Sequence, residues 1–206
     1  MSISTPLIAK VVCEGAPSLL LTSIAWSDRL GRSYEAGLDL LSENGSIDLV
    51  AMLKKPLAIH LNGASNSQWY HGFIQQMTSH GRDGRLHRYH VRLTSCIGLL
   101  EHAGGCRIFQ DQSVVEIIKQ LFEEHGLEGQ LKATLSHAYA KRTYCVQFNE
   151  SDADFIHRLI EEEGIYYFFE FSESNHTLVL IDDHLSHPAT KHLDGIEYRE
   201  VLDRAT

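Results

Sequence analysis

The sequence lacks the residue patterns that mark most redox, nucleotide-binding and hydrolytic sites. It has no CxxC pair, so neither a zinc ribbon nor a thioredoxin-like redox site is supported. It also has no GxGxxG, no GxxxxGK[ST] and no GxSxG, which are the motifs of dinucleotide sites, phosphate-binding loops and nucleophile elbows. We therefore predict no catalytic residue, no bound cofactor and no metal site, and we expect that the protein is not an enzyme.

Positive charge and long apolar runs are also scarce. Lysine and arginine number 18 against 27 aspartate and glutamate residues, and the formal net charge is −9. That balance opposes non-specific binding to nucleic acid or anionic lipid, which depends on basic clusters. No apolar stretch approaches the ~20 residues that cross a bilayer, and the N-terminal segment lacks the basic leader of a secretory signal. We expect a protein made in the cytoplasm without a signal peptide, with no nucleic-acid partner.

Cysteines are few and widely spaced. They are Cys13, Cys96, Cys106 and Cys145. We interpret them as buried, reduced thiols, because free cysteine packs as a small apolar residue and cytoplasmic thiols stay reduced.

The first hundred residues contain a series of short β-strand patterns. Alternation places Tyr89, Val91 and Leu93 on one face of the last strand, as a half-buried antiparallel strand requires. Glycines within 81–85 mark the turn of a long hairpin. Strands at this spacing, with almost no helical pattern, predict a barrel or a sandwich. The predicted strands cover residues 7–14, 19–26, 34–41, 57–62, 69–79 and 86–95.

Two amphipathic helices with similar boundaries are predicted after residue 100. The first follows the N-cap Ser113, has Glu116 in a capping box and ends near Gly126. The second follows Ser151 and stops at Gly164. Their endings, EEHGL and EEEGI, leave two explanations open: an internal duplication, or convergence under the same constraints. The apolar stripes are Val114, Ile117, Ile118, Leu121 and Phe122 in the first helix, and Phe155, Ile156, Leu159 and Ile160 in the second.

The segment 144–183 reads as strand, capped helix and β-hairpin in one unbroken run. The hairpin strands are the aromatic run at 165–171 and its partner at 176–182. Residues 100–183 therefore form a mixed α+β unit. A weak strand pattern at 195–202 lies in a polar tail, and we expect the chain to be a piece of something longer.

One cluster of polar side chains could hold a metal ion. Asp182, Asp183, His184 and His187 lie together in the sequence DDHLSH, and three or four converging side chains of these types can bind zinc. The cluster lacks the helical HExxH frame and precedes Pro188. A solvated polar loop is the alternative, and we favour it.

An acidic run ends the second helix. Glu161, Glu162 and Glu163 could suggest a two-carboxylate mechanism. However, negative charge at a helix C-terminus is unfavourable with the helix dipole. We therefore expect these side chains to be solvated or paired with basic groups such as Lys141 and Arg142.

Exposed aromatic side chains would suit a carbohydrate-binding β-domain, which is the alternative function. Its candidates are Trp69, Tyr70 and the aromatics of 166–171, which could stack on sugars. Aromatic residues at strand spacing are more often core and interface, and we favour that interpretation.

Four segments together resemble the N-terminal region of the VgrG family, the trimeric spike of bacterial type VI secretion systems. They are HGFIQQMTSHGRDGRLHRYHVRLTSCIGLL (71–100), CRIFQDQSVVEIIKQLFEEHGL (106–127), YCVQFNESDADFIHRLIEEEGIYYFFE (144–170) and HTLVLIDD (176–183). The likeness covers about residues 1–185, and it is dense from residue 71. Within the family these long, ordered motifs belong to a region similar to the hub of contractile phage tails.

The resemblance implies an α+β, β-rich fold that is phage tail-hub-like: a β-barrel tube-like domain at 1–100, a mixed α/β domain at 101–185, and the start of a further segment at 186–206. It implies a structural role without catalysis. Full-length members are homotrimers that match the spike to a hexameric inner-tube protein, support membrane puncture and deliver effectors. Further partners, effectors or a tip protein, would bind through C-terminal parts absent from this sequence. The apparatus itself would export the protein.

Overall fold

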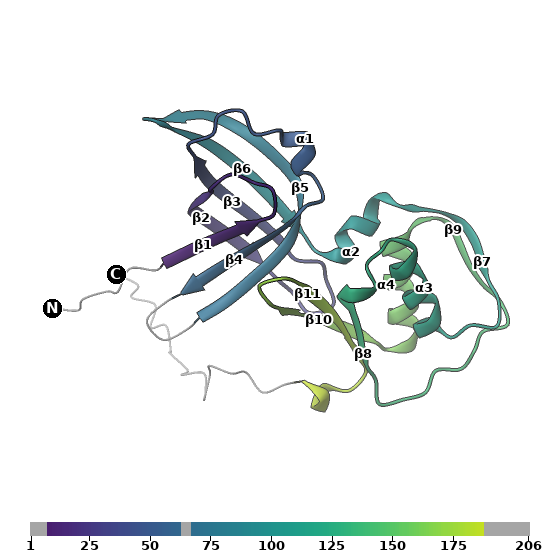
Figure 1. The fold of residues 1–206 in the computed structure, drawn as a ribbon. Coiled ribbons are helices and arrows are strands. Elements are labelled where there is room, and N and C mark those ends of the chain that lie inside the picture. Colours follow the sequence, from purple (N-terminus) through teal and green to yellow (C-terminus); the bar gives the residue numbers. More distant parts are fainter. Residues whose placement is uncertain (1–7, 63–66, 188–206) are drawn as a thin grey trace, which may run out of the picture.

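A curled, antiparallel six-stranded sheet makes up the first half of the protein (Figure 1). The computed structural model describes residues 8–62 and 67–187. The strand order in the sheet is β1-β4-β5-β6-β3-β2, and its long central strands bend so that the sheet forms a half-barrel. The bounds are β1 (Ile8–Cys13), β2 (Leu20–Ser27), β3 (Glu35–Ser42), β4 (Pro56–Asn62), β5 (Ser67–Asp83) and β6 (Leu86–Thr94), with the short helix α1 (Leu49–Met52) before β4.

All six predicted strands are present, and the expectation of a barrel-like first half is confirmed. The strand predicted at 69–79 is longer than expected, since β5 continues to Asp83. Register shifts interrupt its pairing with β6 after Ile74 and after Ser79. Such bulges bend a strand and increase its twist, and Gly81 supplies the positive φ of 83° that the second irregularity needs. The bulges therefore allow this long hairpin to curl.

The concave side of the sheet carries one apolar core. Tyr89, Val91 and Leu93 are 2%, 0% and 1% exposed, so the predicted alternation in β6 is confirmed. Leu38 and Leu40 of β3 bury their side chains in the same core, which leaves the intervening residues of both strands on the outer face.

The second half packs the helices α3 and α4 against two small sheets (Figure 1). β8 lies parallel to β11 in a three-stranded sheet of order β10-β11-β8, and β7 pairs with β9 in a two-stranded ribbon. The elements are α2 (Cys96–Leu99), β7 (Gly104–Phe109), α3 (Val114–Glu124), β8 (Leu131–Thr134), β9 (Cys145–Ser151), α4 (Asp152–Glu163), β10 (Tyr166–Phe171) and β11 (His176–Ile181), with 3-10 turns at Leu100–His102, Glu128–Gln130 and His184–Ser186.

Both predicted helix starts are confirmed at atomic detail. The Ser113 hydroxyl accepts from the Glu116 amide, and the Glu116 carboxylate accepts from the Ser113 amide at 2.7 Å, which completes a capping box. The Ser151 hydroxyl accepts from the Asp154 amide at 3.0 Å. At the other end Gly164 adopts the left-handed conformation, with φ of 69°, that favours glycine at a helix stop. Gly126, with φ of 66°, does the same one residue past His125, the C-cap of α3.

The two halves share buried side chains. Tyr34 and Phe73 of the first hundred residues pack in the same core as Phe155 and Leu159 of α4. The division into two domains at residue 100 thus stays a prediction, and the buried core is continuous across that position. The weak strand predicted at 195–202 lies outside the described residues.

We expect Leu159→Ala to lower the free energy of unfolding by about 2–5 kcal/mol, because truncation of a buried leucine loses apolar contact and leaves a cavity. Leu159 is fully buried between the two helices and the neighbouring sheets. Ile156→Ala should fall in the same range. Urea denaturation measures both, and an exposed α3 substitution, Lys119→Ala, serves as the control. An unchanged midpoint for Leu159→Ala would contradict this packing.

Candidate functional site

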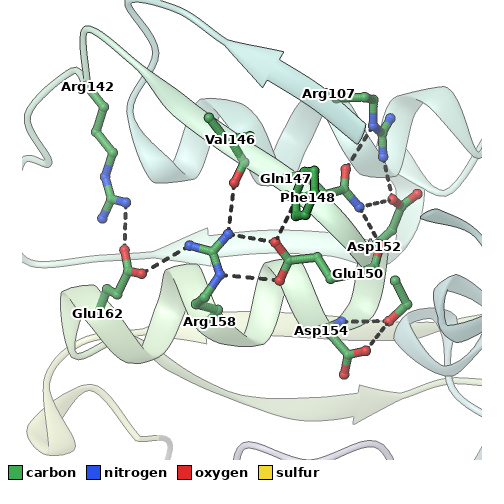
Figure 2. Close-up of polar contacts among 11 residues, drawn as sticks. Arg107, Arg142, Val146, Gln147, Phe148, Glu150, Asp152, Asp154, Arg158 and Glu162 are labelled. Atoms are coloured by element: carbon green, nitrogen blue, oxygen red, sulfur yellow. Dashed lines mark hydrogen bonds and ion pairs between the residues drawn. The ribbon is translucent and has the colours of Figure 1, made fainter. Parts of the chain in front are cut away.

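A cluster of polar side chains lies where the β7–β9 ribbon meets the helices, and Asp152 is at its centre (Figure 2). Asp152 is the first residue of α4, and its side chain is 2% exposed. Its carboxylate accepts from Gln147 at 2.7 Å and lies 2.8 Å from Nε2 of His125. It also pairs with the Arg107 guanidinium, whose Nη1 reaches Glu124 at 2.5 Å. The strands β7 and β9 and the helices α3 and α4 therefore meet at the Asp152 carboxylate.

The environment of Asp152 keeps its carboxyl ionised. Burial raises the pKa of this group, but hydrogen bonds from Gln147, His125 and Arg107 outweigh burial and hold the pKa below its usual value. The position in the first turn of α4 adds the favourable field of the helix N-terminus. A carboxyl whose pKa lies below its usual value is ionised near neutral pH and has no proton to donate there.

A second set of ion pairs continues along the outer side of α4 (Figure 2). Arg158 donates to the Val146 carbonyl at 2.9 Å, to Glu150 at 2.7 Å and to Glu162 at 3.2 Å. Arg142 donates to Glu162 and Glu163, at 2.6 Å each. The hydrogen bond from Arg142 lowers the pKa of Glu162.

Glu162 and Glu163 of the acidic run are thus paired with Arg142, as expected, whereas no ion pair is described for Glu161. Lys141, the other expected partner, contacts a different carboxylate: its Nζ lies 3.3 Å from Glu116 of α3. Glu162 and Glu163 are held by guanidinium groups, and this arrangement resembles a structural clamp more than a pair of catalytic carboxylates.

A buried histidine pair joins the curled sheet to the β10–β11 hairpin. His71 of β5 and His176 of β11 are 2% and 0% exposed, and their Nδ1 atoms are 2.8 Å apart. Nε2 of His176 accepts from the Cys96 amide at 2.8 Å, so the proton of a neutral His176 is on Nδ1 and is donated to His71. Burial lowers the pKa of His71 to about 4 and that of His176 to about 3, with the His71 charge adding to the second shift.

Aromatic rings surround this histidine pair and form the rest of the junction. Trp26 stacks on Tyr34 with ring centroids 4.6 Å apart, and Tyr34 meets Phe169 edge-on at 4.8 Å. Tyr70 and Phe171 contact Trp26 from the sheet and from the hairpin, at 4.8 Å and 5.4 Å. The Tyr34 hydroxyl donates to the His71 carbonyl at 2.6 Å. We call these rings and the two histidines the aromatic junction.

The aromatics considered for carbohydrate binding are largely used in this packing. Tyr70, Phe169 and Phe171 belong to the aromatic junction. Tyr167, on the same side of β10, is fully buried, and its hydroxyl lies 2.9 Å from Nε2 of His157. Trp69 stacks on His60, with centroids 4.3 Å apart, on a different part of the sheet. The structure does not bring Trp69 together with the β10 aromatics on one exposed surface.

The sequence DDHLSH does not converge on one point. Asp182 accepts from the amides of Ser136 and His137, at 2.7 and 2.9 Å, and from the Tyr139 hydroxyl at 3.0 Å. Those bonds outweigh burial and lower the pKa of Asp182 well below its usual range. Asp183, His184 and His187 do not share these partners.

Asp183 caps the following turn through the Leu185 amide at 3.0 Å, and His187 lies 3.1 Å from the Tyr166 hydroxyl. His184 is 84% exposed. Across residues 8–62 and 67–187, no group of three or more His, Cys, Asp or Glu side chains has the geometry to hold a metal ion. Over the same residues, no helix combines the length and apolarity needed to span a bilayer.

The expectation of buried thiols holds for two cysteines and fails for another. Cys96 and Cys145 are buried, Cys13 is half-buried, and all four are free. Cys106 is exposed because it lies on the outer face of the β7–β9 ribbon, opposite Phe148. Strand alternation within 104–109 could have indicated this, but that strand was not predicted.

The centre of the polar cluster is not among the residues that the sequence patterns indicate. Asp152 and Arg107 are 45 residues apart, and His71 and His176 are 105 apart. A local signal exists for Asp152 alone, since an acidic residue directly after an N-cap suits a helix start. No spacing rule joins the other partners.

Comparison with known proteins places this architecture in a family. Residues 27–206 match the phage tail baseplate hub (GPD) family. Type VI secretion system spike protein VgrG1b of Pseudomonas aeruginosa PAO1 is 37% identical over 186 residues, which cover 89% of this chain and 25% of VgrG1b. VgrG1a of the same organism is 37% identical over 182 residues, covering 87% and 28%. The chain spans about a quarter of the length of these curated relatives.

Solved structures share the fold. An Escherichia coli protein, c3393, superposes with a TM-score of 0.79 at 24% identity, over 87% of this chain and 50% of that one. It is described as a component of the type VI secretion system with structural similarity to the T4 tail proteins gp27 and gp5. A tail protein of Neisseria meningitidis MC58 gives 0.60 at 12% identity, over 85% and 50%. The match over residues 27–206, the VgrG relatives and the curled sheet with its α/β partner agree: this chain belongs to the phage tail baseplate hub family.

Proposed function

We propose that this chain is the N-terminal hub region of a type VI secretion spike, which matches a trimeric spike to a hexameric inner tube. The observation that carries the proposal is the family match over residues 27–206, together with 37% identity to a VgrG spike protein. In the proposed assembly, the half-barrels of three copies contribute to a collar on which a tube ring docks. The full-length protein would be exported by the apparatus and would support membrane puncture and effector delivery.

The geometry supports a mechanical role. A spike base must transmit force between the tube-facing sheet and the rest of the protein without local unfolding. In this chain the aromatic junction and the His71–His176 pair join the sheet to the hairpin, and the Asp152 cluster joins the ribbon to both helices. Fully buried, hydrogen-bonded polar groups rigidify a fold and specify one arrangement of its parts.

The same contacts support the proposal that this region is not catalytic. Arg107, Arg142 and Arg158 each hold two or more carboxylates or carbonyls, so the guanidinium groups of the cluster are already occupied. Asp152 and Asp182 accept several hydrogen bonds each from the protein itself. Effectors, a tip protein and the remaining contacts between copies would then depend on parts of the relatives that extend past this sequence.

The oligomeric state of the longer protein tests the trimeric part of the proposal. Sedimentation velocity of a protein that includes the downstream residues should give the mass of three copies. A strictly monomeric protein over a wide concentration range would contradict it. Substitutions on the outer face of the half-barrel, such as Arg92→Glu, should impair assembly while leaving the thermal midpoint of unfolding nearly unchanged, because Arg92 lies half-exposed on that face.

A further inference from the structure

The outer face of the β7–β9 ribbon carries an exposed apolar patch. Ile108 of β7 is 58% exposed, and Phe148 of β9 is 75% exposed. Cross-strand pairing places Ile108 beside Val146, and Cys106 beside Phe148, so these four side chains share one face. Tyr144, 59% exposed, precedes β9 and has the same parity as Val146. Exposed apolar side chains that lie side by side on one face are typical of a binding surface.

The two edges of this ribbon differ. A side chain of α4 already engages β9, since Arg158 donates to the Val146 carbonyl at 2.9 Å, and within β9 the Phe148 amide donates to the Glu150 side chain at 3.4 Å (Figure 2). Within the described residues no third strand pairs with β7, so its other edge is open. An open edge beside an apolar face is a template for pairing with another strand.

Charge and size indicate which kind of partner fits. The charged side chains next to the patch are paired internally, Arg107 with Glu124 and Glu150 with Arg158, so the patch offers no free charge to a charged partner. Five side chains are also far short of the ~800 Å² per partner that a stable globular interface needs. Strand addition avoids that requirement, because main-chain hydrogen bonds supply affinity and alternate side chains supply contact area.

We propose that the β7 edge binds an extended, apolar segment of a partner protein as a third strand. The incoming strand would pair with the main chain of β7 and cover Ile108 and Phe148 with its own alternating apolar side chains. The proposal goes beyond tube docking, because the ribbon belongs to the α/β region and not to the half-barrel.

A synthetic peptide tests this. The probe is a fluorescein-labelled Thr-Val-Thr-Val-Thr-Val-Lys peptide, and its fluorescence anisotropy is followed as the 206-residue protein is added. We expect saturable binding that weakens by about tenfold or more in Ile108→Lys and in Phe148→Lys, since a charge in the patch removes a central apolar contact. A matched probe with alternate amides N-methylated should bind at least about tenfold less, because it cannot donate to a strand edge.

Val50→Lys is the control, since Val50 is an equally exposed apolar residue on α1, away from the ribbon. It should bind the probe as the unaltered protein does. The proposal is overturned by absence of binding, by equal binding of the N-methylated probe, or by an equal loss in Val50→Lys. A concentration-dependent dimer that Ile108→Lys abolishes would also overturn it, because a second copy would then be the occupant. Phe148→Lys and the N-methylated probe keep the test valid if Ile108→Lys fails to fold.

Discussion

Asp152→Ala should lower the free energy of unfolding by about 3–5 kcal/mol, the cost of removing one partner from a buried ion pair. The substitution leaves the Arg107 guanidinium with Glu124 and the side-chain oxygen of Gln147, and it removes the carboxylate that the Gln147 amide group and His125 bond to. Urea denaturation of the purified protein at pH 7.5 measures the change. Because four elements meet at this carboxylate, we also expect faster hydrogen exchange in β7 and β9.

Two further variants make the Asp152 prediction specific. Asp154→Ala removes the same charge from the same helix turn, but Asp154 is exposed and bonds to Ser151 only among the hydrogen bonds described, so the loss should be about 1 kcal/mol or less. Asp152→Asn retains one acceptor oxygen and should fall between the two alanine variants. If Asp152→Ala and Asp154→Ala lower the free energy of unfolding equally, the polar cluster adds no stability beyond that of a negative charge in the first turn of α4.

Acid should destabilise the protein through the His71–His176 pair. Both residues have a pKa in the folded protein, about 4 and about 3, that is below the value of ~6.5 for an unfolded chain. As pH falls below ~6.5, the unfolded chain gains protons that the folded protein does not bind, so the free energy of unfolding falls. The loss begins near pH 6.5 and continues to about pH 4 for His71 and about pH 3 for His176.

The expected loss is about 2 kcal/mol for each histidine between pH 7.5 and pH 5, or about 4 kcal/mol for the pair. The neighbouring titratable groups stay neutral in this range, because burial raises the pKa of Tyr34 and raises that of Cys96 to about 12. Urea denaturation at both pH values measures the loss. His71→Leu should reduce the pH-dependent part by about 2 kcal/mol, even though it also weakens the protein at pH 7.5.

His184→Ala serves as the matched control, because its side chain is 84% exposed and is not part of the aromatic junction. Its pH dependence should equal that of the unaltered protein. If His71→Leu retains the full loss between pH 7.5 and pH 5, the buried pair is not the source of the acid sensitivity.

Local features of the fold were predictable because each depends on neighbouring residues. The capping serines Ser113 and Ser151 and the stop glycine Gly164 act within one helical turn, and the structure places them as the sequence indicated. The alternation of Tyr89, Val91 and Leu93 likewise needs only a pleated strand with one buried face. The strands β7 and β8 were not predicted, because neither has a clear local pattern. β7 begins with two glycines, and β8 has four residues that are mostly exposed.

The polar contacts were not predictable, because they depend on which elements the topology brings together. Asp182 shows this most clearly. In the sequence it stands beside Asp183 and His184, which suggested a metal site, but in the fold it binds the segment at 136–139, more than forty residues earlier. Conversely, nothing near Arg107 in the sequence indicates its pairing with Asp152.

We propose that this region is an assembly part that a tube ring recognises. The most direct measurement is co-sedimentation of the longer protein, including its downstream residues, with the purified hexameric inner-tube protein. We predict one complex with the mass of three copies of the spike protein and one hexameric ring, and weaker binding for Arg92→Glu. Separate sedimentation of the two proteins at every concentration tested would contradict the claim.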